Sequence, residues 1–119
     1  MSQKILLIVN DPPYGSERAY NALRLANNLL KQEPSPTLRI FFVGDGAANA
    51  KGGQSVPQGY YNINSILRAI TKKGGEVGVC GTCMDARGLS DKELLDGTHR
   101  STLDEMTEWT LWADKVIVF

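Results

Sequence analysis

Residues 5–9, Ile-Leu-Leu-Ile-Val, form an unbroken apolar run near the start of the 119-residue sequence. A run without polar alternation is typical of a strand that is covered on both faces of a sheet. Two prolines and a glycine within residues 10–15 end this strand. The apolar residues that follow recur at helical spacing, which predicts a helix with Ser16 as its cap and Pro34 as its stop.

Strand and helix patterns alternate through the rest of the sequence. We predict strands at residues 38–43, 76–79 and 115–119, and helices at about 63–73 and 101–113. Strands joined by helices require right-handed crossovers and a mostly parallel sheet. The expected fold is therefore a three-layer, doubly wound α/β architecture, similar to that of flavodoxin, with helices on both faces and one domain over residues 1–119.

Three local features complete this prediction. Residues 47–58 are rich in Gly, Ala, Asn and Ser without an apolar period, which predicts a long and mobile loop. Ser90 with Glu93, and Ser101 with Asp104, match the capping-box spacing at the starts of two helical segments. The later of these helices carries its apolar side chains on one side, at Leu103, Met106, Thr110 and Ala113. Trp109 and Trp112 fit either a core or a subunit interface.

Charge and composition narrow the function classes. Thirteen basic residues balance thirteen acidic ones, so no net field favours nucleic acid or an anionic membrane. The N-terminal apolar run is shorter than a membrane span or a signal-peptide core. We therefore expect a cytoplasmic protein without nucleic-acid or membrane partners.

The chain's only two cysteines, Cys80 and Cys83, directly follow the strand at residues 76–79. In parallel sheets, the loops after the strands gather at one edge, where ligands usually bind. Residues 10–15, 44–58 and 80–88 are loops of this kind. The two thiols are therefore expected at the functional edge of the sheet.

Several cofactor sites are not supported. The Gly44-Asp45-Gly46 turn has asparagine where a dinucleotide fingerprint needs its third glycine, and the sequence has no Walker A motif. Two cysteines and a lone His99, expected to cap a turn or to face water, are too few ligands for a zinc site. We expect no metal and no nucleotide cofactor.

The paired thiols suggest chemistry of their own. A reactive cysteine needs its thiolate form, which a nearby cation or a helix N-terminus favours. Arg87 is the cation within this loop, and backbone N–H groups add to its field if a helical turn begins at Thr82. No histidine is adjacent in sequence to act as a base, and attack on a sulfane sulfur needs none.

Several motifs resemble those of one family. The stretch from Cys80 to Gly88 has the pattern Cys-x6-Arg-Gly and resembles the DsrE/DsrF/TusD group of sulfur-relay proteins, most closely its YchN-like branch. Three further segments carry the resemblance along nearly the whole chain. They are Asn10 with Pro13–Glu17, Gly59–Ile63, and Trp109–Val116.

The resemblance implies a doubly wound subunit and a homo-oligomer, either a trimer or a hexamer. It also implies that Cys80 is the cysteine that carries a persulfide. Relay proteins of this group generally lack a second cysteine, so Cys83 leaves the assignment between the two thiols open.

We hypothesise a persulfide sulfurtransferase that takes sulfur from a donor protein and passes it to an acceptor protein. Cys80 and Cys83 are its candidate reactive residues. Supporting roles are expected for Arg87, Gly88, Thr82, Asn10, Tyr14, Gly44 and Asp45, the last four of them at the mouth of the pocket. Three alternatives stay open: a binding module for a small ligand or a protein, a Cys-x-x-Cys redox switch, and cysteines that only fill space.

Overall fold

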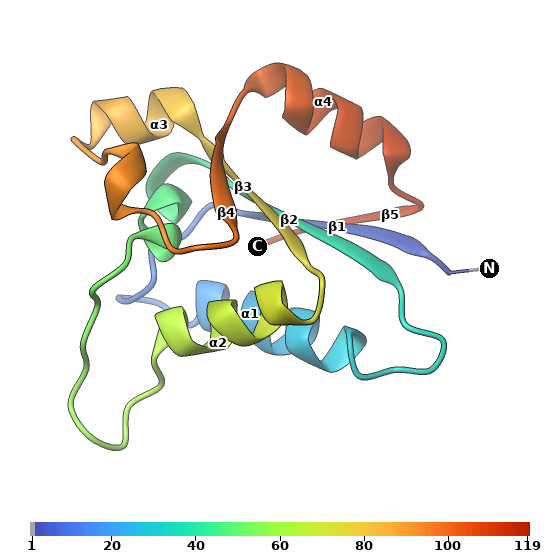
Figure 1. Ribbon diagram of the computed structural model, residues 1–119, viewed down its shortest axis with the longest axis horizontal. Helices are drawn as coiled ribbons and strands as arrows, with labels where there is room; N and C mark the ends of the chain where they lie inside the picture. Colours follow the sequence, from blue (N-terminus) through green and yellow to red (C-terminus); the bar gives the residue numbers. More distant parts are fainter. Residues whose placement is uncertain (1) are drawn as a thin grey trace.

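The computed structural model describes residues 2–119 and contains one sheet of five parallel strands in the order β4-β3-β2-β1-β5 (Figure 1). The strands are β1 (Lys4–Val9), β2 (Thr37–Phe42), β3 (Glu76–Cys80), β4 (Thr98–Ser101) and β5 (Lys115–Val118). The α-helices are α1 (Arg18–Leu29), α2 (Ile63–Lys72), α3 (Gly81–Ala86) and α4 (Leu103–Trp112). Two 3-10 helices are η1 (Gly44–Ala50) and η2 (Asp91–Glu93).

The sheet lies between two helical layers, as predicted. The helices α1 and α2 pack against one face, and α4 covers the other (Figure 1). From β1 to β4 the chain moves across the sheet in one direction, and α4 then returns it to β5 at the opposite edge. Because parallel crossovers are right-handed, this reversal places α4 on the face opposite α1 and α2. The predicted doubly wound architecture is confirmed.

The central strand β1 confirms the prediction from the apolar run. Five of its six residues are buried, since side chains on both of its faces meet a helical layer. Alternate residues divide between the layers: Leu7 and Val9 face α1 and α2, whereas Leu6 and Ile8 face α4.

The face beneath α4 has an aromatic centre. Trp109 is 4% exposed and meets Phe41 edge to face, with ring centroids 6.1 Å apart. The guanidinium of Arg39 lies over Trp112, 4.0 Å from the ring centroid. Trp109 therefore belongs to the core, and Trp112 forms the half-buried edge of the same layer.

Several local predictions were wrong. Residues 80–88 were expected to be a loop, but Gly81–Ala86 form the short helix α3. Residues 44–50 form η1 rather than open loop, because the buried Asn49 donates to two backbone carbonyls. The N-cap residue of α1 is Glu17, which makes no side-chain capping bond. Ser16, one residue earlier, donates to Asp11 and accepts from the backbone N–H of Arg18. The helix α4 is capped by Thr102, because Ser101 is still paired within β4.

A further error concerns the apolar side of α4. Met106 and Ala113 pack against the sheet, but Leu103 in the first turn is 75% exposed. The capping box at Ser90 and Glu93 is confirmed at the start of η2.

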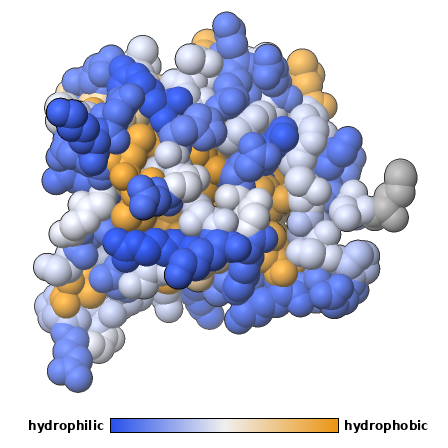
Figure 2. Space-filling model, viewed as in Figure 1, coloured by the Kyte–Doolittle hydropathy of each residue, from blue (hydrophilic) through white to orange (hydrophobic). Residues whose placement is uncertain are grey.

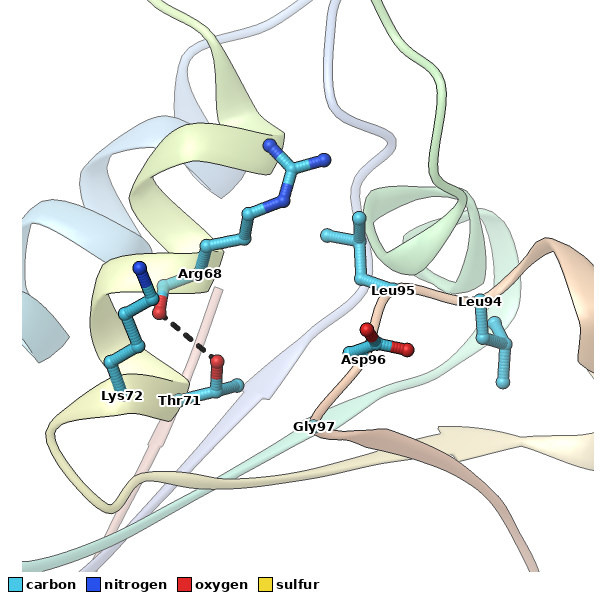
Figure 3. A pocket seen from close by; sticks show the side chains of 7 residues that line it. All are labelled: Arg68, Thr71, Lys72, Leu94, Leu95, Asp96 and Gly97. Carbon is cyan, nitrogen blue, oxygen red and sulfur yellow. Dashed lines mark hydrogen bonds between the residues drawn. The ribbon is translucent and has the colours of Figure 1, made fainter.

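The view in Figure 2 shows hydrophilic side chains over most of one face, with apolar surface exposed in the recess above α2. A hollow of about 520 Å³ lies there, between α2 and the segment that leads into β4 (Figure 3). Its lining includes Arg68, Lys72 and Asp96. Because Gly97 immediately precedes β4, this hollow lies at the end of the sheet opposite the thiols. No helix within residues 2–119 is long and apolar enough to cross a membrane.

Candidate thiol site at the end of strand β3

The two cysteines lie where the chain changes from one helical layer to the other. After β3 the chain enters α3, whose Met84 is buried in the α1 and α2 layer. After β4 it enters α4 on the opposite face. Such a switch point leaves a crevice between the ends of adjacent strands, where open α/β sheets bind ligands. Cys80 and Ser101, which are register partners in β3 and β4, lie at this crevice.

The Cys-x-x-Cys spacing determines how the two thiols face each other. Cys80 is the N-cap residue of α3, and Cys83 is three residues further along, on the same side of the first turn. An N-cap side chain accepts a hydrogen bond from the backbone N–H of this third residue. The backbone N–H of Cys83 donates to Cys80 Sγ over 3.4 Å, and the two sulfur atoms are 2.6 Å apart.

Further donors surround the pair. Thr82 Oγ1 is 3.3 Å from Cys80 Sγ, and the backbone N–H of Gly44 donates to Cys83 Sγ over 3.1 Å. Gly44 has a φ of +60°, in the left-handed region that favours glycine and disfavours side chains. The backbone of η1 is thereby fixed against the second thiol.

These contacts separate the acidities of the two thiols. Burial alone raises the pKa of Cys80, but hydrogen bonds from Cys83 and Thr82 outweigh it and bring the pKa below its ordinary value. Burial, together with the hydrogen bond that its thiol donates to Cys80, raises the pKa of Cys83. Gly44 and the charge of Arg87 oppose this rise without cancelling it. Cys80 is therefore the better thiolate, and Cys83 stays protonated to higher pH.

Arg87 acts on Cys83 rather than on the Cys80 sulfur. Its guanidinium forms an ion pair with Asp45 over 2.8 Å and donates to the backbone carbonyl of Cys83 over 3.0 Å. Both partners of the ion pair are exposed, so its contribution to stability is small. It links η1 to the end of α3 beside the thiols.

A largely apolar cavity of about 600 Å³ opens beside Cys80 on the α4 face. Phe41, Val43 and Met106 line it from the sheet and from α4, and both cysteines reach it. Arg100 stands at this cavity and donates to both carboxylate oxygens of Asp85, over 2.7 and 2.8 Å. The site therefore combines a thiolate, an adjacent thiol and an apolar space that would hold a small group.

Comparison with known proteins agrees with this geometry. The profile of the DsrE/DsrF-like family matches residues 3–119. The chain belongs to the DsrE/DsrF-like family. Protein YchN of Escherichia coli K12 is 44% identical over 117 residues, covering 98% of this chain and 99% of YchN. The crystal structure of the E. coli ychN protein superposes with a TM-score of 0.93 and the same coverage.

Two more distant relatives extend the comparison. Sulfurtransferase TusD of Salmonella typhi is 26% identical over 125 residues, covering 95% of this chain and 97% of TusD. MTH1491, a protein of unknown function from Methanobacterium thermoautotrophicum, is 13% identical with a TM-score of 0.80 over 99% of this chain and 100% of its own. The second likeness concerns the fold alone. Membership of the DsrE/DsrF-like family associates the chain with sulfur relay.

Within this DsrE/DsrF-like fold, the structure brings together most of the predicted site. Thr82 and Gly44 contact the two sulfurs, and Asp45 pairs with Arg87. Gly88, with a φ of +66°, ends α3 and lines a separate hollow of about 250 Å³ with Arg87 and Lys51.

Two predicted residues lie elsewhere. The Asn10 side chain donates to the carbonyl of Phe119, at the end of the chain. The Tyr14 hydroxyl accepts from the backbone N–H of Ile63, and its ring stacks on Tyr61. Both hold neighbouring segments in place and are not among the residues that line the cavity at Cys80.

Other members of the site were missed from the sequence. Arg100 and Ser101 come from β4, a strand without an apolar residue to signal it, and Met106 comes from α4. The pairing of Cys80 with Ser101 is what places them beside the thiols. Ser101 donates to Glu105, which also binds His99. Within residues 2–119, no three His, Cys, Asp or Glu side chains gather into a metal-binding group.

Proposed function

We propose that this protein is a sulfur carrier in which Cys80 holds a sulfane sulfur as a persulfide and passes it to an acceptor thiol. The observation that carries the proposal is the position of Cys80 as the N-cap of α3, where the backbone N–H of Cys83 donates to its sulfur and the Thr82 hydroxyl lies within hydrogen-bond distance, able to donate to a thiolate. Hydrogen bonds to the charged form favour the thiolate. Membership of the DsrE/DsrF-like family and the likeness to Sulfurtransferase TusD support the same function.

Loading and unloading are two exchanges of the same kind. In loading, the Cys80 thiolate attacks the outer sulfur of a donor persulfide, a new S–S bond forms, and the donor thiolate leaves. In unloading, an acceptor thiolate attacks the outer sulfur now on Cys80, and Cys80 leaves as thiolate. Because a thiol of low pKa is also a good leaving group, the same hydrogen bonds assist both steps. Neither exchange changes the total oxidation state or requires a cofactor.

The other predicted residues support this site by position. We propose that the ion pair of Arg87 with Asp45 keeps η1 against α3, so that Gly44 remains within reach of Cys83. Gly88 allows the chain to turn sharply after α3. A donor and an acceptor protein would both approach the exposed rim around Thr82.

Mass spectrometry of the chain after incubation with a persulfide donor tests the proposal. An addition of about 32 Da should appear on the peptide that contains Cys80. Cys80→Ser should abolish the addition, whereas the matched Cys83→Ser variant should retain it. Equal sulfur uptake by Cys80→Ser and the parent would refute the assignment.

A second candidate function is favoured by the cavity of about 600 Å³ beside Cys80. An apolar space of this size, with a few polar groups, is typical of small-ligand sites. A binding module would keep its ligand after both cysteines are replaced by serine. It would also have slowly reacting thiols, so fast labelling of Cys80 near neutral pH argues against it.

We also propose a cytoplasmic homo-oligomer, either a trimer or a hexamer. Leu111 is 83% exposed and Val118 62% exposed, and the strand β5 lies at an edge of the sheet. An apolar edge of this kind is suited to contact with another copy of the chain. Native mass spectrometry gives the number of subunits, and a monomer at micromolar concentration would contradict this proposal.

A further inference from the structure

Cys83 stands beside the sulfur that would become the inner atom of a Cys80 persulfide. Its Sγ is 2.6 Å from Cys80 Sγ, compared with about 2.05 Å in a covalent disulfide. The two sulfur atoms are therefore close enough for a disulfide to form between them. The outer sulfur of the persulfide, in contrast, has the cavity on the α4 face as free space.

The surroundings of Cys83 allow its thiolate to attack Cys80 Sγ but keep that thiolate scarce near neutral pH. The backbone N–H of Gly44, 3.1 Å from Cys83 Sγ, is in place to stabilise a thiolate there, and Arg87 contributes positive charge nearby. Burial and the hydrogen bond to Cys80 nevertheless keep the pKa of Cys83 raised. The thiol at residue 83 is therefore positioned to attack, but at neutral pH only a small fraction of it is ionised.

We infer that Cys83 gives the loaded protein a second outlet, in which the stored sulfur is reduced and released as hydrosulfide. This inference rests on the proposed function, since it needs a persulfide on Cys80. The Cys83 thiolate attacks Cys80 Sγ and forms the Cys80–Cys83 disulfide, while the bond between Cys80 Sγ and the outer sulfur breaks. The outer sulfur leaves with its proton and the electron pair as HS⁻.

The balance of this step defines its co-reactant. The outer sulfur is reduced, and the two cysteine sulfurs supply its electrons by forming a disulfide. Two equivalents of a thiol, or one dithiol, then reduce the disulfide by thiol exchange and restore the starting protein. The complete cycle is a thiol-dependent persulfide reductase, an activity distinct from sulfur transfer between proteins.

The relative positions of the cysteines explain why release competes with transfer. An acceptor protein must reach the outer sulfur, which faces the cavity and the rim. Cys83 already lies beside the inner sulfur and needs no partner. Release therefore occurs when no acceptor is bound, and its rate depends on ionisation of Cys83.

A single-turnover experiment with the full chain tests the inference. The reduced protein, Cys83→Ser and Cys80→Ser are loaded with inorganic polysulfide without oxygen and desalted at once. Hydrosulfide is then trapped with a bimane reagent, and intact masses are recorded over time. The parent should release up to one hydrosulfide per chain and end about 2 Da below its dithiol mass. Cys83→Ser should keep its added mass of about 32 Da and release at least tenfold less.

The outcomes distinguish this inference from the proposed function. If neither the parent nor Cys83→Ser acquires sulfur, the carrier function itself fails. If both hold a persulfide of equal lifetime without release, the carrier stands and the reductase activity is refuted. A persulfide that moves to Cys83 in the parent would also refute it, because attack would then be on the outer sulfur.

Discussion

Replacing Thr82 with valine removes one hydrogen-bond donor from the Cys80 thiolate while nearly preserving side-chain shape. Thr82 Oγ1 is 3.3 Å from Cys80 Sγ, and toward a thiolate the hydroxyl must be the donor. A hydrogen bond of this kind contributes about 0.5–1.5 kcal/mol in a protein. Its loss raises the pKa of Cys80 and lowers the thiolate population near pH 7 by roughly two- to tenfold.

Alkylation kinetics measure this change directly. In a Cys83→Ser background, where Cys80 is the remaining thiol, the iodoacetamide rate near neutral pH should fall roughly two- to tenfold in Thr82→Val. At high pH the two rates should converge, because Cys80 is then fully ionised with or without the Thr82 hydroxyl. Thr82→Ser keeps the hydroxyl and is expected to react like its parent. Coincident pH profiles for the valine and serine variants would show that Thr82 does not stabilise the thiolate.

Substitutions at three further positions test the stability of the fold. In Gly78→Ala, a Cβ would lie 3.2 Å from Trp109 and 3.3 Å from Phe41, so we expect a loss of roughly 1–3 kcal/mol in urea unfolding. An unchanged urea midpoint would mean that Trp109 and Phe41 move enough to make room for the added Cβ. Asn62→Ala removes the side chain that caps α2 over 3.1 Å and should cost about 1 kcal/mol, whereas Asn62→Asp should be nearly neutral. Burial raises the pKa of Glu105, but hydrogen bonds from Ser101 and His99 outweigh it and lower that pKa. The resulting stability is present above about pH 4.3, the unfolded value, and is lost as pH falls through the lower folded pKa. In Glu105→Gln, the urea midpoint should therefore fall less steeply as the pH is lowered than it does in the parent. Parallel curves for the two proteins would contradict this.

The parts of the fold that the sequence predicts are those whose signals are local. The run at residues 5–9 indicates a strand buried on both faces, because no polar side chain interrupts it. The strand β4 has no such signal: Thr98–Ser101 contains no apolar residue and exists because it pairs with β3. The helix η1 depends likewise on distant contacts, since Asn49 donates to the carbonyl of Asp11.

The candidate site likewise has one part that local sequence signals predict and another that depends on contacts between distant segments. Spacing alone places Thr82 and Cys83 beside Cys80, since all three belong to one helical turn. Gly44 was expected at the pocket mouth, but its contact with Cys83 requires β2 and β3 to be neighbours. Arg100 could not be predicted, because its strand was missed.

The two thiols also predict how the fate of a bound sulfur depends on pH. If Cys83 is the nucleophile that discharges a Cys80 persulfide, hydrosulfide release from the loaded chain should increase with pH until Cys83 is fully ionised. Because the pKa of Cys83 is raised, this increase should continue above the ordinary range of a cysteine. Bimane trapping from pH 6 to pH 10 measures the rate, with Cys83→Ser as the background. A flat profile, or an equal increase in Cys83→Ser, would mean that hydroxide or a second chain removes the sulfur. A rise confined to the parent would mean that Cys83 itself discharges the Cys80 persulfide, as the contact between the two sulfur atoms suggests.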